Sequence, residues 1–211
     1  MPFPLAPDHM YSLRGQTIKQ FGYDQESQVD YTFNNLGYRS PVKFVDHGSP
    51  IVILGNTISF GLGLPVEQSF ARIIAQELDC DVYNFAWGCH AHTNAEQLVL
   101  LKQILQVIKP QQVIFQINNL DRIRRNNHVQ FNNPNDIVIS EFVKFRQELE
   151  QTLKSTPHFL LYWDENQYSV PLPRCLIHNR YHCDTSLKSN ATTFGPRSHK
   201  LIAYSILKEI K

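Results

Sequence analysis

The stretch Ile51-Val-Ile-Leu-Gly-Asn-Thr-Ile-Ser-Phe-Gly-Leu-Gly-Leu64 decides the fold that this sequence predicts. It opens with four apolar residues, three of them β-branched, which is typical of a strand buried on both faces of a parallel sheet. The chain then breaks at Gly55-Asn-Thr57 and soon enters an amphipathic pattern. A hydroxyl on a sharp turn between a strand and a helix is where many enzymes expose a nucleophile. Thr57 is therefore the first candidate for a functional residue.

The composition is that of an ordinary globular protein. A chain of 211 residues is long enough for one sizeable α/β domain, and its net charge of +1 provides no global field for nucleic acid or acidic membranes. The start of the chain has no basic and no apolar region of a signal peptide, and no apolar run approaches the length of a membrane span. We expect a cytoplasmic protein, or part of an intracellularly assembled complex, whose four scattered cysteines are reduced.

Hydrophobic patterns predict strands and helices in alternation after the opening strand. The expected helices are Pro65–Leu78, Asn94–Ile108, Ile137–Leu153 and Pro196 to the end, and the expected strands are Asp81–Ala86, Gln112–Ile117 and Phe159–Trp163. Such an alternation implies right-handed βαβ units. The sequence therefore predicts a three-layer α/β/α sandwich with a central parallel sheet, as in flavodoxin-like folds.

Two parts of unequal size are expected. Residues 1–28 read as an N-terminal arm that lies extended over the domain, and residues 29–211 as the domain itself. Within the domain, Val29–Arg39 predicts a short edge strand or hairpin, and residues 120–135 and 167–189 read as long loops. In parallel sheets the functional sites lie at the carboxyl ends of the strands. Three turns fall there: Gly55–Thr57, Trp87–Gly88 and Asn118–Asn119.

Five segments follow the block order of a known family. They are the leader Tyr31-Thr-Phe-Asn-Asn-Leu-Gly-Tyr-Arg39, the turn Gly55-Asn-Thr-Ile-Ser-Phe-Gly61, Gly88, Gln116-Ile-Asn-Asn119 and Gly195-Pro-Arg-Ser-His-Lys-Leu-Ile-Ala203. With them the chain resembles the SGNH (GDSL-type) hydrolases, a family of esterases, lipases and acetyl-transfer enzymes, over roughly residues 29 to 208. The family's own blocks read Gly-Asp-Ser-x-[Ser/Thr]-x-Gly, a glycine, Gly-x-Asn-Asp and Asp-x-x-His.

The resemblance implies a site at the three strand ends. Family members use a serine nucleophile, a histidine base, an aspartate that orients the histidine, and an oxyanion hole made by the serine amide, a glycine and an asparagine. Carried over, Thr57 takes the place of the serine, and Gly88 and Asn118 retain the oxyanion positions. The acid position holds Asn190 and the base position holds Thr193.

These departures predict the loss of hydrolysis. A hydroxyl is a feeble nucleophile unless a base takes its proton, and Thr193 cannot be that base. Losing triad members costs a factor on the order of 10⁴ to 10⁶ in rate. We therefore expect a non-catalytic module that binds a carbohydrate or acyl-ester ligand in its cleft, or that packs against protein partners in a larger assembly.

The alternative is an esterase or acetylesterase that uses Thr57 with a displaced histidine. His182 is the first candidate, with His178 and Asp184 close to it in sequence. As a loop residue His182 also fits a solvated side chain without a role. His199 matches a helix position that is not catalytic in the family, and we interpret it as a structural or capping residue.

Two further clusters were weighed as binding sites. Cys89-His-Ala-His92 and His182-Cys-Asp184 contain ligand types that suit zinc, but their spacing matches no standard pattern, so we expect no metal and no cofactor. Arg122-Ile-Arg-Arg125 is a basic loop that reads as a solvated segment. A weak contact of this loop with nucleic acid or an acidic partner is the remaining alternative.

Overall fold

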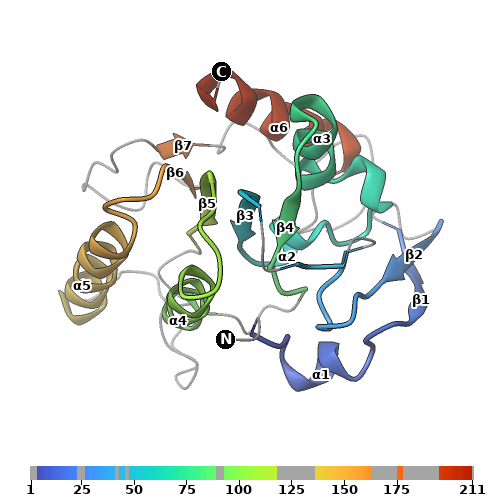
Figure 1. Cartoon of the computed structure of the whole chain (residues 1–211), viewed down its shortest axis with the longest axis horizontal. Coiled ribbons are helices and arrows are strands. Elements are labelled where there is room, and N and C mark those ends of the chain that lie inside the picture. Colours follow the sequence, from blue (N-terminus) through green and yellow to red (C-terminus); the bar gives the residue numbers. More distant parts are fainter. Residues whose placement is uncertain are drawn as a thin grey trace.

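The computed structural model describes residues 4–22, 27–40, 43–45, 48–88, 93–117, 136–162, 175–177 and 195–210. A parallel sheet of five strands runs through its centre in the order β4-β3-β5-β6-β7 (Figure 1). The strands are β3 (Ile51–Leu54), β4 (Val82–Asn84), β5 (Gln112–Gln116), β6 (His158–Tyr162) and β7 (Cys175–Ile177). The quoted stretch supplies β3, which pairs with β4 on one side and β5 on the other.

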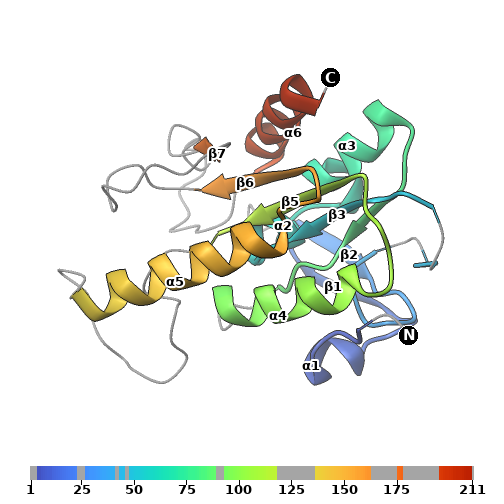
Figure 2. The ribbon, with the colours of Figure 1, turned by 60° about the vertical axis from the view of Figure 1, so that its left-hand side comes forward.

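Helices cover both faces of the sheet. Helix α3 (Phe70–Leu78) and helix α6 (Pro196–Ile210) lie together on one face, and α4 (Asn94–Leu105) and α5 (Asp136–Thr152) lie on the other, as Figures 1 and 2 show. The sheet therefore needs apolar side chains on both faces, which explains why all four residues of β3 are at most 1% exposed. The predicted three-layer sandwich is confirmed.

The strands divide their side chains between two cores. Val52 and Leu54 of β3 and Phe115 of β5 belong to the larger core, which includes residues of α4 and α5. Ile51 and Ile53 alternate with them and face the core that includes Phe70, Ile74 and Ile202. This alternation is the period of two that a strand imposes.

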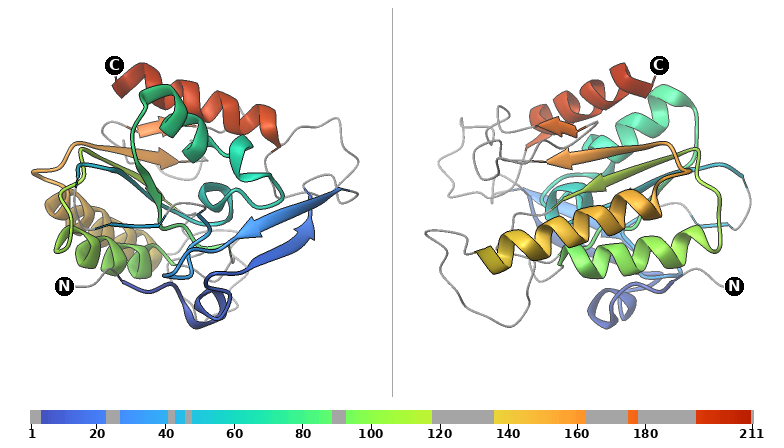
Figure 3. Two further views of the ribbon diagram at one scale, coloured as in Figure 1. Left: turned by 45° about the vertical axis from the view of Figure 1, so that its right-hand side comes forward. Right: turned by 90° about the vertical axis from the view of Figure 1, so that its left-hand side faces the viewer.

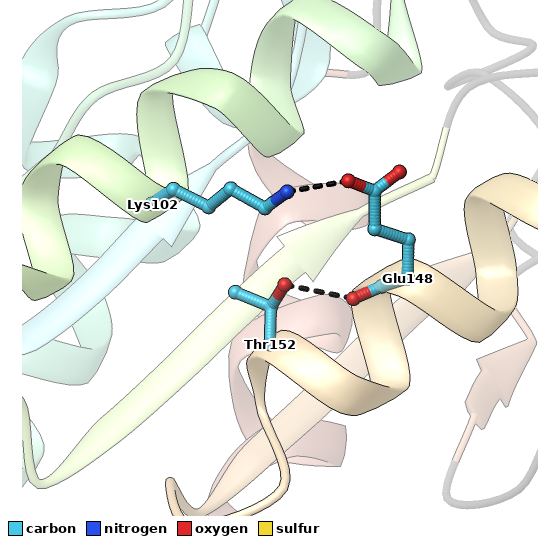
Figure 4. A network of polar contacts seen from close by, with 3 residues as sticks. All are labelled: Lys102, Glu148 and Thr152. Atoms are coloured by element: carbon cyan, nitrogen blue, oxygen red, sulfur yellow. Dashed lines mark hydrogen bonds and ion pairs between the residues drawn. The ribbon is translucent and has the colours of Figure 1, made fainter.

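The outer helices α4 and α5 are also joined by an ion pair on their exposed side. Lys102 of α4 pairs with the carboxylate of Glu148 of α5 (Figure 4). One turn later Thr152 donates its hydroxyl to the Glu148 carbonyl at 2.7 Å. Both charged side chains are partly exposed, at 43% and 57%, so the pair adds little to stability.

Two expectations about the elements were wrong. The helix expected over Pro65–Leu78 is broken, because a 3₁₀ turn at Val66–Gln68 ends before Ser69 and α3 starts afresh at Phe70. The Ser69 hydroxyl accepts the Arg72 amide at 3.3 Å and caps the new helix. The loop expected over residues 167–189 contains β7, whose three residues are too few for a periodic pattern.

The N-terminal arm is more structured than expected. It contains the short helix α1 (Asp8–Tyr11) and strand β1 (Thr17–Phe21), which pairs antiparallel with β2 (Gln28–Thr32) in a sheet of its own (Figure 3). The hairpin or edge strand predicted from Val29 is thereby confirmed, with its partner on the other side of residue 28. The division into an arm and a domain at that residue stays a prediction.

Candidate functional site

Thr57 begins a single helical turn directly beyond the carboxyl end of β3. This helix, α2, covers Thr57–Phe60, and its N-cap is Asn56, whose Oδ1 accepts the Ile58 amide at 3.2 Å. The preceding strand is buried and extended, so the chain must turn sharply at Gly55 to enter the helix. Thr57 is only 4% exposed, and its hydroxyl has no hydrogen-bond partner among the described residues.

Gln116, the last residue of β5, holds this turn in place. Its Oε1 accepts the Asn56 amide at 3.3 Å, the Ser59 amide at 3.2 Å and the Ser59 hydroxyl at 2.6 Å. Its Nε2 donates to Asn56 Oδ1. Gln116 and Ser59 are fully buried, so these bonds form away from water, where leaving them unmade would be costly. The groups of this network are all neutral.

Gly55 is required by the closeness of that network. A Cβ at this position would lie 2.3 Å from Ser59 Oγ and 2.7 Å from Gln116 Oε1. No larger residue fits without moving the backbone of the turn or the amide that holds it. The glycine that opens the first family block is therefore required here for steric reasons.

The second predicted turn lies beside the first. The Trp87 amide donates to the Gly55 carbonyl at 3.1 Å, and a Cβ on Gly88 would meet the Phe60 ring of α2 at 2.8 Å. Asn84, at the end of β4, donates its side-chain amide to the Ser59 carbonyl at 2.7 Å. The structure thus brings the turns at Thr57 and Gly88 to one edge of the sheet.

The other end of α2 is held by a charge. Arg39 is 4% exposed and donates through Nη1 to the carbonyls of Phe60 at 3.1 Å and Gly61 at 2.5 Å, and through Nη2 to the Leu64 carbonyl. Its guanidinium carbon lies 3.7 Å from the centre of the Tyr31 ring. Burial lowers the pKa of Arg39 to about 10, although the nearby Tyr31 and Glu67 act in the opposite direction.

The two histidines with described side chains, His158 and His199, make hydrogen bonds to backbone groups and not to Thr57. His199 of α6 is buried between α3 and α6, where its Nδ1 accepts the Phe70 amide at 3.1 Å and its ring stacks on Phe70. Burial lowers its pKa to about 3, with a further lowering by the positive charge of Arg39. His158 opens β6 and therefore sits at the amino edge of the sheet. The capping role predicted for His199 is confirmed.

Many of the predicted site residues lie outside the described part of the chain. They are Asn118 of the oxyanion hole, His182 and the neighbouring His178 and Asp184, the degenerate positions Asn190 and Thr193, the cluster Cys89–His92 and the basic loop Arg122–Arg125. Their roles stay predictions. In the ranges that the structure does describe, no group of three or more His, Cys, Asp or Glu side chains could hold a metal ion.

Sequence reasoning missed the two residues that fix α2. Gln116 stands at the end of an apolar strand, where a fully buried amide needs partners, and this was the available signal. Arg39 closes the leader segment, and nothing in its sequence neighbourhood indicates that its partners are 21 to 25 residues further along. Among the described helices, none is long and apolar enough to cross a membrane.

Comparisons with known proteins place the chain by its fold. No family model matches the sequence, and no curated protein matches it. Among solved structures, TesA matches with a TM-score of 0.51 at 14% identity over 77% of this chain and 98% of its own. The psychrotrophic esterase EstA from Pseudoalteromonas sp. matches with 0.51 at 15% identity over 77% and 97%.

A protein from Desulfitobacterium hafniense that is described as belonging to the lipolytic G-D-S-L family matches with a TM-score of 0.52 at 16% identity, over 76% of this chain and 99% of its own. Identities this low show the fold and not the chemistry. The chain has the α/β/α fold of the SGNH/GDSL esterases.

Proposed function

We propose that this chain is a non-hydrolytic module of the SGNH type that binds an acyl-ester or carbohydrate ligand at the turn of Thr57. The observation that carries the proposal is the state of the Thr57 hydroxyl, which is buried and has no partner among the described residues. A nucleophilic hydroxyl needs a base within hydrogen-bond reach. The two histidines with described side chains are engaged elsewhere, His199 with the Phe70 amide and His158 with the Thr156 carbonyl.

The electrostatics of the turn support the same proposal. Where the family block has an aspartate, Asn56 accepts from Ile58 and Gln116. The hydrogen bonds that Gln116 and Asn84 make to this turn join amides, a hydroxyl and a carbonyl, so these bonds stabilise its shape without supplying a charge for an imidazolium. Hydrolysis by the family route needs that charge at the base.

Ligand binding, unlike hydrolysis, does not need a charge beside a base. Hydrogen bonds with Gln116 and Asn84 hold the turn, so its position is fixed before a ligand binds. The Thr57 hydroxyl and the Gly88 amide are the donors that we assign to a ligand carbonyl or hydroxyl, with Asn118 as the third. Acyl esters and acetylated sugars carry both of these acceptors. In a larger assembly, the proposed ligand is a protein partner that presents such a group.

The competing function is an esterase in which His182 or His178 serves Thr57 as the base. One observation favours it: a buried hydroxyl without a partner is costly, and an imidazole would satisfy it. EstA, which shares the fold, is an esterase inhibited by monoethylphosphonate. A phosphonate probe is therefore a direct test of whether Thr57 is activated.

The test compares hydrolysis of p-nitrophenyl acetate and covalent labelling by an alkyl phosphonate in five proteins. These are the wild type, Thr57→Ala, Thr57→Ser, His182→Ala and the matched control Thr152→Ala on α5. We expect equal background hydrolysis in all five and no phosphonate adduct by mass spectrometry. Turnover in the wild type that disappears in Thr57→Ala and remains in Thr152→Ala would overturn the proposal. A large gain in Thr57→Ser would do so as well, because it would reveal a working base.

The ligand is then sought directly. Binding of p-nitrophenyl acetate or of an acetylated sugar is followed by the tryptophan fluorescence of Trp87. We expect saturable binding in the wild type. In Thr57→Val, which keeps the shape of the side chain and removes the hydroxyl, binding should be weakened at least tenfold. Equal binding in Thr57→Val would exclude the hydroxyl as the contact.

A further inference from the structure

A small pocket lies beside α2, between α3 and β4. It has a volume of about 50 Å³, and Arg39, Ser69, Arg72 and Asn84 are among its lining residues. Space of this size holds a few water molecules, which is the room that one phosphate or carboxylate group needs. The pocket does not include Thr57 or Gly88, so it is separate from the site proposed above.

Arg39 brings a positive charge to this pocket, and the exposed Glu67 is a nearby carboxylate that acts on it. The three hydrogen bonds of Arg39 go to neutral carbonyls, and no carboxylate pairs with it in the described part of the chain. A guanidinium has five N–H donors, and the buried Nε of Arg39 has no partner. A buried charge is usually paired, because the loss of hydration is otherwise costly. Its field also reaches His199, whose pKa it helps to lower.

The amino end of α3 adds to this potential. Helix α3 has nine residues, and its first turn faces the pocket with Ala71 and Arg72. The Phe70 amide is taken by His199, and the amides of Arg72 and Ile73 by Ser69. For the Ala71 amide the described residues show no acceptor. The partial positive charge of the helix end and this amide favour an anion.

Arg72 gives the pocket a second guanidinium. Its side chain is half-buried, and no ion pair holds it within the described residues. At the far end of the pocket Asp81 is exposed, so its negative charge is screened by solvent more than the charge of Arg39. Two guanidiniums and a helix amino end therefore face two exposed carboxylates, Asp81 in the lining and Glu67 near Arg39, whose charges are screened by solvent.

We propose that the pocket between Arg39, Arg72 and the amino end of α3 binds a small oxyanion, the phosphate or carboxylate group of a ligand. Arg72 reaches the anion directly with its fork of N–H donors, the Ala71 amide donates to it, and the charge of Arg39 is compensated by it. The pocket has room for that one group, and the rest of the ligand lies outside it.

The experiment titrates the full chain with inorganic phosphate, and separately with acetate, in a buffer of constant ionic strength made up with chloride. Binding is followed by calorimetry and by the amide resonances of Ala71 and Arg72. We expect saturable phosphate or acetate binding with a dissociation constant of about 1 mM or tighter. Tighter binding of phosphate identifies the bound group as tetrahedral, and tighter binding of acetate identifies it as a planar carboxylate.

Three variants decide where the anion binds. Arg72→Gln should weaken binding at least tenfold, and Arg39→Lys should weaken it while the protein stays folded. Arg146→Gln removes the same charge from α5, on the opposite face of the sheet, and should bind within twofold of the wild type. No saturable binding of either probe to the wild type would overturn the proposal, as would equal weakening in Arg72→Gln and Arg146→Gln. The result is independent of hydrolysis at Thr57.

Discussion

Helix α2 is held by opposite means at its two ends. At its start the neutral amide of Gln116 joins Asn56 and Ser59, and the groups in this network satisfy one another. At its end the charged Arg39 holds three carbonyls and retains an unpaired Nε. The first arrangement is closed and fixes a shape. The second is open, and its charge is available for a further ligand.

The two ends of α2 differ in whether polar groups are left for a further contact. The neutral network around Gln116 positions the turn of Thr57 through amides and a hydroxyl, and none of these groups is a base or a charge. In the anion-binding proposal, the guanidinium of Arg39 responds to an anion because its Nε has no partner among the described residues.

The largest effect is expected for Arg39→Met. The substitution keeps the packing on Tyr31 and leaves three buried carbonyls without their donor, so we expect a loss of about 3 kcal/mol or more in the free energy of unfolding. Urea unfolding followed by circular dichroism measures it. Arg14 is the control, because it also lies over a tyrosine ring, at 4.3 Å from Tyr11, but is exposed. Arg14→Met should cost less than about 1 kcal/mol, and equal losses would show that burial of the charge is not the cause.

The second prediction compares two buried glutamines. Gln116→Met strands the amides of Asn56 and Ser59 and should cost about 2 to 3 kcal/mol. Gln97 of α4 is also fully buried, but neither atom of its amide has a partner among the described residues. Gln97→Met should therefore be neutral or stabilising, because it removes two unpaired polar atoms. Chemical unfolding of both variants measures the contrast, and similar losses would contradict the role given to Gln116.

The third prediction concerns acid. In the folded protein the pKa of His199 is lowered to about 3 from an ordinary value of 6.5, so the unfolded state binds more protons between these values. Stability should therefore fall as the pH drops from about 6.5 toward 3, at no more than about 1.4 kcal/mol per pH unit from this group. His199→Gln keeps an acceptor for the Phe70 amide and removes the titration. Its unfolding free energy, measured over this range, should fall less steeply than that of the wild type, and parallel curves would contradict the assignment.

The smallest effect belongs to the exposed pair Lys102–Glu148. A double-mutant cycle with Lys102→Ala and Glu148→Ala should give a coupling of about 0.2 to 1 kcal/mol that shrinks in high salt. Thermal unfolding in low and high salt measures it. A coupling energy as large as the loss in Arg39→Met would mean that an exposed ion pair contributes as much to stability as the buried charge of Arg39.

The sequence allowed the sheet and the turn to be predicted, because their signals are local. The apolar run of β3 and the glycine and hydroxyl that follow it are adjacent in the chain, and the helices around them have regular patterns. Strand β7 was missed because three residues carry no period. The start of α3 was missed because Ser69 acts as a cap inside an unbroken helical pattern.

The supports of the site could not be predicted in the same way. Gln116 reads as one polar residue in a strand, and the turn it holds is 60 residues away. Arg39 meets α2 only after the leader segment has packed against Phe60. Such contacts depend on tertiary structure, and no spacing rule relates the two partners. The resemblance to the SGNH family located the turn but not what holds it.

The bond between Asn56 and Gln116 also bears on the timing of folding. A helix of four residues does not persist alone, so the turn must wait until β5 has docked beside β3. During synthesis the first part of the site therefore stays unformed until residue 116 has left the ribosome. In the finished protein the amides of Asn56 and Ser59 are held by a side chain of β5, so we expect their exchange with solvent to report how firmly this turn is docked on the sheet rather than the motion of a free loop.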